Sequence, residues 1–357
     1  MSDHGHDDQH AHDHEHPAGL KGWLQGVFTP HSHDSADSVD RALEDSGKGI
    51  RALKISLAGL GVTAALQVVV VLASGSVALL ADTVHNFADA LTAVPLGIAF
   101  WIGRRAPTKR YTYGYGRAED LAGIFIVAMI ALSAAVAAWE ATRRLFDPRD
   151  VEHVGWVMLA GLIGFAGNEL VAVYRIRVGR EIGSAALVAD GLHARTDGLT
   201  SLAVVAGALG VAAGWRLADP VVGLAITVAI VFVLKGAARD IYRRLMDSVD
   251  PDLVDEVSEV VAGVAGVEGV DRVAIRWVGH ELRAEVDIVS DCDLTVAGAH
   301  AIAEEAHHRL LHEIPKLSRA TIHTSPCHHD GRDHHAVTSH HFGSRAEAGR
   351  DEARRPR

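Results

Sequence analysis

Apolar residues dominate the middle of this chain, and polar residues dominate both ends. Between about Lys54 and Leu234 the apolar residues form six stretches, each long enough to cross a bilayer, which takes roughly 20 residues. Their approximate bounds are Leu53–Ala73, Leu79–Ile102, Leu121–Leu145, Val154–Tyr174, Ala186–Ala212 and Pro220–Gly236. The pattern therefore predicts a polytopic α-helical membrane domain of six transmembrane helices at 48–246.

The second and fifth stretches carry the same polar signature, Asp-x-x-His-x-x-x-Asp. It occurs as Asp82/His85/Asp89 and as Asp190/His193/Asp197. Positions i, i+3 and i+7 of an α-helix lie on one face, so each triplet forms one polar stripe. Placing an acid at the centre of a bilayer costs about 2.5–3.5 kcal/mol on insertion scales. We therefore expect the two stripes to face each other, water or an ion.

Four of these side chains can form a closed metal site, because a His and an Asp four residues apart on one helix can bind the same ion. The set is His85, Asp89, His193 and Asp197. Two imidazoles and two carboxylates suit tetrahedral Zn²⁺, while Co²⁺, Ni²⁺, Cd²⁺ and Fe²⁺ remain alternatives. A closed site leaves no position for a water nucleophile, so we expect no enzymatic activity. Ionisable sites within a membrane are typical of transport.

Protonation of the ligands supplies a way to drive such transport. Imidazole, with an ordinary pKa near 6.5, binds metal only when neutral, so Zn²⁺ and protons compete for it. This hypothesis makes Zn²⁺ the exported ion and the proton its counter-ion, with no resident cofactor. Asp82 and Asp190 are supporting candidates that orient the imidazoles or lie on the ion's path. The alternative is that each is an acid near a helix end that faces water. We expect Arg195 to pair with an acid.

The region after the sixth stretch has the pattern of a soluble domain. It predicts a helix at Leu253–Val264, strands at Gly269–Trp277 and Leu282–Val289, a helix at Thr295–Leu311 and a strand at Ala320–His323. The order αββαβ predicts a ferredoxin-like α+β domain at 247–326. The polar, His-rich segments 1–47 and 327–357 are interpreted as disordered tails that bind metal loosely or are simply solvated.

Charge and cysteine content narrow the function further. The formal net charge is −11, and no basic patch argues for a nucleic-acid partner. Two Cys are too few for a disulfide framework. Lys and Arg gather on one side of the predicted spans, for example Arg104 and Arg105 after the second span and Arg175 after the fourth. The positive-inside rule then favours a multi-pass protein of the cell membrane with both termini in the cytoplasm.

Four motifs together resemble those of the cation diffusion facilitator family. They are Ala81–Asp89, Tyr113–Glu119, Asp190–Asp197, and Leu245–Asp247 with Asp250-Pro251. The resemblance extends from about residue 50 to 326. It implies a homodimeric antiporter with a cytoplasmic ferredoxin-like domain, in which the four-residue set is the transport site. It also implies a zinc preference, because both helices contribute a His.

The sequence departs from the family pattern in two places. Some members bind a second metal with His in the loop between spans two and three, where this chain has Tyr111 and Tyr115, so we expect that site to be absent. In the cytoplasmic domain the metal-binding residues of the family are matched only in part. The candidates are His300 and His323, with Asp287 and Asp271 where other members carry His. We expect a mixed His/Asp site there; the alternative is that these residues have local structural roles.

One function of a different class remains open. A membrane-tethered protein could bind or sense metal with its tails and soluble domain without transporting it. The two functions differ in the membrane stripes, because loose metal binding by the tails needs no paired ligands inside the bilayer.

Overall fold

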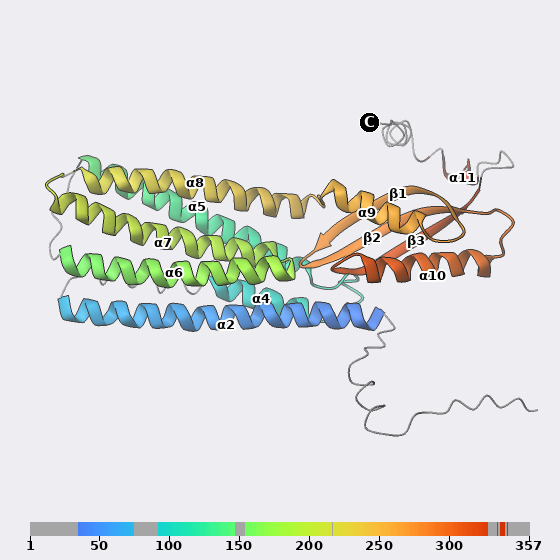
Figure 1. Ribbon diagram of the computed structural model, residues 1–357, viewed down its shortest axis with the longest axis horizontal. Helices are drawn as coiled ribbons and strands as arrows, with labels where there is room; N and C mark the ends of the chain where they lie inside the picture. The colour runs from blue at the N-terminus through green and yellow to red at the C-terminus, as the bar shows by residue number, and fades with distance from the viewer. Residues whose placement is uncertain are drawn as a thin grey trace, which may run out of the picture.

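The computed structural model describes residues 35–74, 92–146, 154–215, 217–327, 334, 336–339 and 341. Long helices lie side by side at one end of the molecule, and a small sheet with two helices lies at the other (Figure 1). The helices of the bundle are α2 (Ser35–Ser74), α4 (Ala93–Gly103), α5 (Arg117–Phe146), α6 (Val154–Ile182), α7 (Ala185–Ala212) and α8 (Ala218–Leu245).

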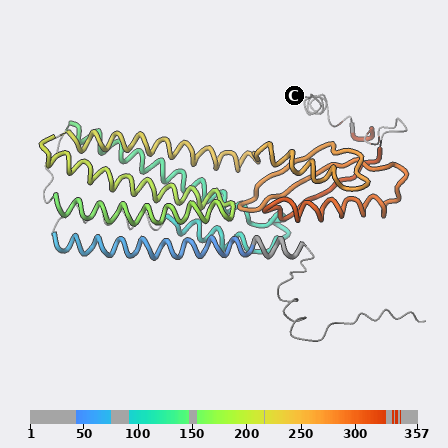
Figure 2. Tube along the Cα trace, viewed as in Figure 1, coloured from blue at the N-terminus to red at the C-terminus, as the bar shows by residue number. Residues whose placement is uncertain are grey.

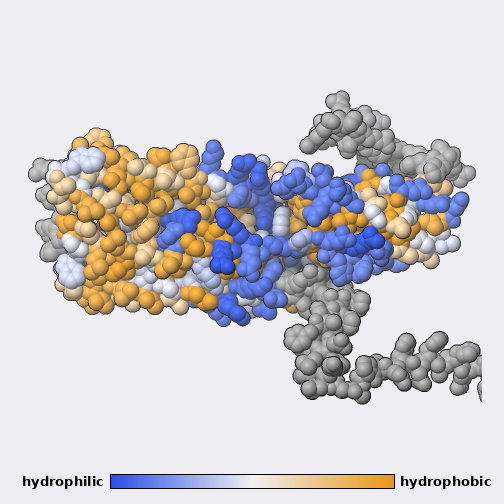
Figure 3. Space-filling view, in the orientation of Figure 1, coloured by the Kyte–Doolittle hydropathy of each residue, from blue (hydrophilic) through white to orange (hydrophobic). Residues whose placement is uncertain are grey.

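Four of these helices, α2, α5, α6 and α8, are long and apolar enough to cross a membrane by length and composition. Their outer faces expose large apolar side chains such as Leu72, Trp139 and Phe232, and apolar residues make up most of the face of the bundle shown in Figure 3. Helix α7 is 28 residues long and carries the acidic stripe in its first half, and it is not among these four. Most of the predicted second span lies outside the described residues, and only its end is seen, as α4. The structure thus supports a helical membrane domain with four clear spans of the six predicted.

Helix α7 is the centre of the bundle. It packs against α6, α8 and α5, whereas α2 lies on the far side of α6 (Figure 2). Close approach between α6 and α7 depends on Gly191, where a Cβ atom would lie 3.0 Å from the Ile176 nitrogen and 3.1 Å from the Ala172 oxygen. Because its neighbours surround it, α7 can hold polar side chains away from lipid.

Helix α2 begins earlier than expected. Residues 35–47, which we predicted as part of a disordered tail, are helical. Lys48 lies 3.4 Å from Glu44 and 3.3 Å from Asp45, and such pairs one turn apart favour a helix. Ser46 is buried against the soluble domain, as described below. The helix therefore extends beyond the apolar span because its polar end has its own contacts.

The soluble domain has the predicted order αββαβ. Its elements are α9 (Pro251–Ala262), β1 (Val267–Val278), β2 (Glu281–Ser290), α10 (Val296–Glu313) and β3 (Leu317–Pro326). Strands β1 and β2 are antiparallel, β2 and β3 are parallel, and β2 is central. Alternate residues of β2, such as Val286 and Ile288, are buried with Leu310 of α10. The two-layer α+β prediction is confirmed.

Local signals explain where these elements start and turn. Asp250 caps α9 by accepting a hydrogen bond from the Asp252 nitrogen, and Thr295 caps α10 by accepting one from the Gly298 nitrogen. Gly279 has a φ of 63°, which permits the tight turn from β1 to β2. The domain extends one residue further than predicted, to Cys327, which we assigned to the second tail. Cys327 is buried, and its nitrogen donates a hydrogen bond to the Ser290 oxygen at 2.8 Å. Within that predicted tail, Ala336–Ser339 forms the short helix α11.

Candidate metal centre

One half of the predicted metal site is visible on α7. The Nδ1 atom of His193 lies 3.7 Å from Oδ1 of Asp197, and the two side chains are 1% and 9% exposed. Ser184 caps the N-terminus of α7, because its hydroxyl accepts a hydrogen bond from the Leu187 nitrogen. The four-residue spacing thus brings an imidazole and a carboxylate together inside the bundle. Their role as ligands stays a prediction.

The other half of the site lies outside the described residues. Asp82, His85 and Asp89 all fall between positions 75 and 91, which the structure does not describe. The four-ligand arrangement therefore stays a prediction that rests on the repeated signature.

Asp190, at the start of the α7 stripe, forms a buried ion pair. Its Oδ2 atom lies 2.9 Å from Nη1 of Arg175 on α6, and the two side chains are 0% and 1% exposed. The alternative in which Asp190 faces water is therefore wrong. The expectation that Arg175 lies beyond the end of the fourth span is also wrong, because α6 continues to Ile182 and holds Arg175 inside the bundle. Two buried charges in contact compensate one another where lipid and protein exclude water.

Arg195 has the structural role predicted for it. Its Nε and Nη2 atoms donate to the two carboxylate oxygens of Glu169 on α6, at 3.1 and 2.7 Å. Both side chains are about one-third exposed. This two-point contact fixes α7 against α6 on the side away from the polar stripe.

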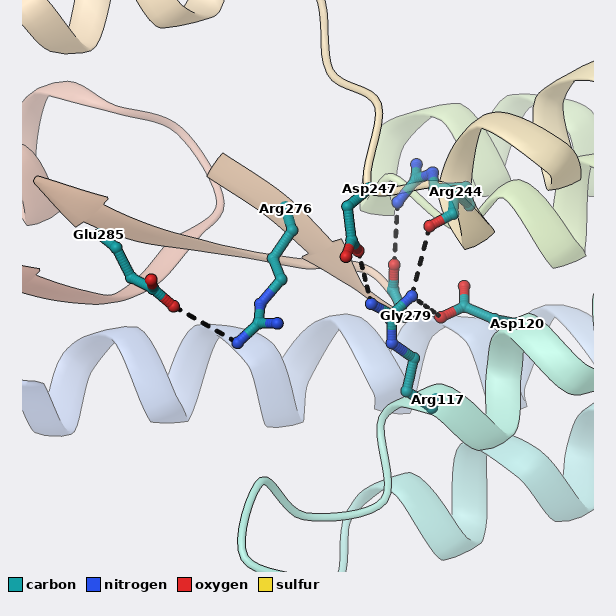
Figure 4. Close-up of polar contacts among 7 residues, drawn as sticks. All are labelled: Arg117, Asp120, Arg244, Asp247, Arg276, Gly279 and Glu285. Carbon is teal, nitrogen blue, oxygen red and sulfur yellow. Dashed lines mark hydrogen bonds and ion pairs between the residues drawn. The ribbon is translucent and has the colours of Figure 1, made fainter. Parts of the chain in front are cut away.

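Sequence reasoning missed a polar junction between the bundle and the soluble domain (Figure 4). Arg117, at the start of α5, lies 2.6 Å from the Asp247 carboxylate and 3.3 Å from that of Asp120. Arg244, at the end of α8, donates to the Gly279 oxygen of the β1–β2 turn at 2.9 Å. Two of the family motifs, Tyr113–Glu119 and Leu245–Asp247, therefore meet at this junction. The motifs were visible in the sequence, but nothing in it indicated that they contact each other.

His280, in the same turn, extends this junction to the first helix. Its Nδ1 atom lies 2.7 Å from Oε2 of Glu119, and its Nε2 atom lies 3.1 Å from the Ser46 hydroxyl. Its ring centroid is 5.9 Å from that of Phe100 on α4. One side chain of the soluble domain therefore contacts α2, α4 and α5. A lone His in a turn gave no signal of this role.

The predicted ligands of the cytoplasmic domain are brought together only in part. Asp287 and His323 are direct neighbours in the β2–β3 register, so they share the face of the sheet opposite the helices. Asp271 is exposed beside a register shift in β1, and His300 is exposed on α10. Among the described residues of one chain, none of these four candidates belongs to a group of three or more metal-binding side chains that lie close enough to hold one ion.

Comparison with known proteins gives the family. Residues 53–246 match the model of the cation efflux transmembrane domain, and residues 249–327 match that of the cation efflux protein cytoplasmic domain. A probable cation efflux system protein of Mycobacterium tuberculosis strain H37Rv is 59% identical over 89% of this chain and 96% of its own length.

More distant relatives are named for particular metals. The manganese efflux system protein MneP of Bacillus subtilis is 25% identical over 71% of this chain and 88% of its own length. The zinc transporter ZitB of Escherichia coli K12 is 31% identical over 54% of this chain and 60% of its own length. On the strength of both domain matches, the chain belongs to the cation diffusion facilitator family of cation efflux membrane proteins.

Proposed function

We propose that this protein exports Zn²⁺ from the cytoplasm in exchange for protons, and that His85, Asp89, His193 and Asp197 hold the ion in transit. The observation that carries the proposal is the buried His193–Asp197 pair on the central helix of the bundle, 3.7 Å apart. An imidazole and a carboxylate at that spacing can close on one divalent ion, and the repeated signature supplies the same pair from a second helix.

Ligand chemistry favours zinc over manganese. Mn²⁺ prefers a shell rich in oxygen, whereas two His and two Asp provide the mixed tetrahedral set that Zn²⁺ takes readily. Relatives named for zinc and for manganese are both known, so family membership leaves the metal open. Co²⁺, Ni²⁺, Cd²⁺ and Fe²⁺ are the other candidates. Comparing the transport rates of these ions through the purified protein ranks them.

Proton exchange follows from the two imidazoles. A neutral His binds the cation facing the cytoplasm; when the site opens to a more acidic exterior, protonation of His weakens binding and the ion leaves. The protonated, empty site then returns and loses its protons to the cytoplasm. Asp82 and Asp190 support the site without belonging to the ion cage.

The placement in the membrane is part of the proposal. We propose a homodimer in the cell membrane with both termini in the cytoplasm, in which Asp287, His323, Asp271 and His300 form a mixed site near the contact between copies. A hydrophilic band between the apolar bundle and the soluble domain supports a position of the bundle in the membrane with the soluble domain outside it (Figure 3). Mass measurement in detergent checks the assembly, and a monomer mass would contradict it.

The experiment compares zinc uptake into proteoliposomes by the wild-type protein and by variants of the stripe. His193→Ala and Asp197→Asn are expected to lower uptake at least tenfold, because each removes one of four ligands. Asp240→Asn is the matched control, since Asp240 is exposed near the end of α8. Asp89→Ala tests the second helix in cells. Unchanged zinc tolerance with that variant would favour a non-transporting, metal-binding protein.

A further inference from the structure

A cluster of two thiols and a carboxylate lies where the two parallel strands of the soluble domain end. Ser290 ends β2 and Pro326 ends β3, and the two are register partners, so the residues that follow emerge side by side. The Cys292 nitrogen donates to Sγ of Cys327 at 3.2 Å. One ligand atom each from Asp291, Cys292 and Cys327 lies within 4.8 Å of the other two.

This cluster is remote from the membrane site. The β1–β2 turn contacts the bundle through Gly279 and His280, and β2 runs from that turn towards the opposite end of the domain (Figure 1). Ten extended residues span roughly 33 Å. The cluster is also distinct from Asp287 and His323, which lie within the strands.

The backbone holds the cluster in place. The Cys327 nitrogen donates to the Ser290 oxygen, and the Asp293 nitrogen donates to Oδ1 of Asp291 at 2.8 Å. Cys327 is buried, whereas Asp291 and Cys292 are exposed. One thiol is therefore anchored in the domain, and the other two ligands are open to ions from solvent. Both Cys are free thiols in the structure.

The donor set determines which ion fits. Thiolates bind soft and borderline cations, and two of them with a carboxylate leave one tetrahedral position for water. Zn–S bonds of about 2.3 Å place two sulfurs about 3.8 Å apart in a tetrahedron, so the cluster needs only a small side-chain adjustment. A side-chain hydrogen bond with the neighbouring Cys327 thiol raises the pKa of the Cys292 thiol to about 11. A cation must therefore displace protons when it binds.

We propose that Asp291, Cys292 and Cys327 form a binding site for a soft or borderline divalent cation, such as Zn²⁺ or Cd²⁺, at the membrane-distal end of the cytoplasmic domain. The site adds thiolate ligands to a protein whose transport site has none. It does not depend on the proposed antiport, because no residue is shared between the two sites.

The test uses Co²⁺ and Cd²⁺ as probes of the reduced full-length protein in detergent. Thiolate-to-metal charge transfer gives near-ultraviolet absorption that His and carboxylate ligands lack, so binding by the many His of the chain does not obscure it. Wild type is expected to develop this absorption and to release protons as it binds. Cys292→Ser and Cys327→Ser are expected to abolish the absorption, and Asp291→Asn to weaken binding about tenfold.

Two controls keep the result clear. Asp255→Asn changes an exposed acid of α9 that lies outside the cluster, and binding is expected to be unchanged. Because Cys327 is buried, Cys292→Ser is the decisive variant, and an unfolding curve verifies that it folds. Absence of charge-transfer absorption in the reduced wild type, or its persistence in Cys292→Ser, would overturn the site. A Cys292–Cys327 disulfide that forms in air, with no metal binding after reduction, would overturn it in favour of a redox pair.

Discussion

The buried ion pair between Asp190 and Arg175 makes the sharpest prediction about the membrane domain. Substituting Asp190 by Asn keeps the shape of the side chain but leaves the Arg175 guanidinium without its 2.9 Å carboxylate partner. Both side chains are at most 1% exposed, so water cannot replace the lost charge. Removing one partner of a buried pair typically costs about 3–5 kcal/mol. We expect a loss of that size in the free energy of unfolding.

The assay is denaturant unfolding of purified protein in detergent, followed by Trp fluorescence. The double variant Arg175→Met/Asp190→Leu removes both charges and is expected to recover most of the loss, because apolar replacements for a buried pair are often neutral. The matched control is Glu169→Gln, which breaks the pair with Arg195 in which both side chains are about one-third exposed, and it should cost about 1 kcal/mol or less.

Two results would refute this reasoning. A cost below about 1 kcal/mol for Asp190→Asn would mean that the pair is not a desolvated one. No recovery in the double variant would mean that Asp190 acts on something other than Arg175. Zinc flux in the double variant also separates two proposed roles: normal flux would exclude Asp190 as a step on the ion's path.

Three further predictions concern other parts of the chain. Gly191→Val should separate α7 from α6 and lower stability by about 1–3 kcal/mol, because the added atoms meet the α6 backbone; an unchanged unfolding curve would contradict this. Alkylation of Cys292 by iodoacetamide should be slow at neutral pH and become faster up to a pH of about 11, since only the thiolate reacts. Cys327→Ala removes the side-chain hydrogen bond, lowers the pKa of Cys292 towards 9.0 and should speed the reaction at pH 8. Arg117→Met should loosen the junction and increase hydrogen exchange in the β1–β2 turn, where equal protection in variant and wild type would count against the contact.

Much of the fold follows from local pattern. The apolar stretches predict the long helices, and the amphipathic and alternating patterns predict the elements of the soluble domain. The errors arise where tertiary contacts override composition. Arg175 looks like a loop residue but is buried by its pairing with Asp190, and Cys327 looks like tail but is held by the end of β2.

The candidate site shows the same division. The spacing of His193 and Asp197 requires them to share a helix face, so the sequence alone brings them together. The junction around Arg117, Arg244 and His280 joins residues more than a hundred positions apart, and no periodicity in the chain records such pairings. Long-range polar contacts of this kind become visible only when the helices are packed.

Proton-coupled zinc flux tests the central claim most directly. Zn²⁺ movement through purified protein in proteoliposomes is measured with and without an imposed pH gradient. The account predicts that zinc moves towards the acidic side, that its flux falls when the gradient is collapsed, and that it is lost in His193→Ala. Zinc flux of the same size with and without the gradient, or flux that survives in His193→Ala, would contradict it.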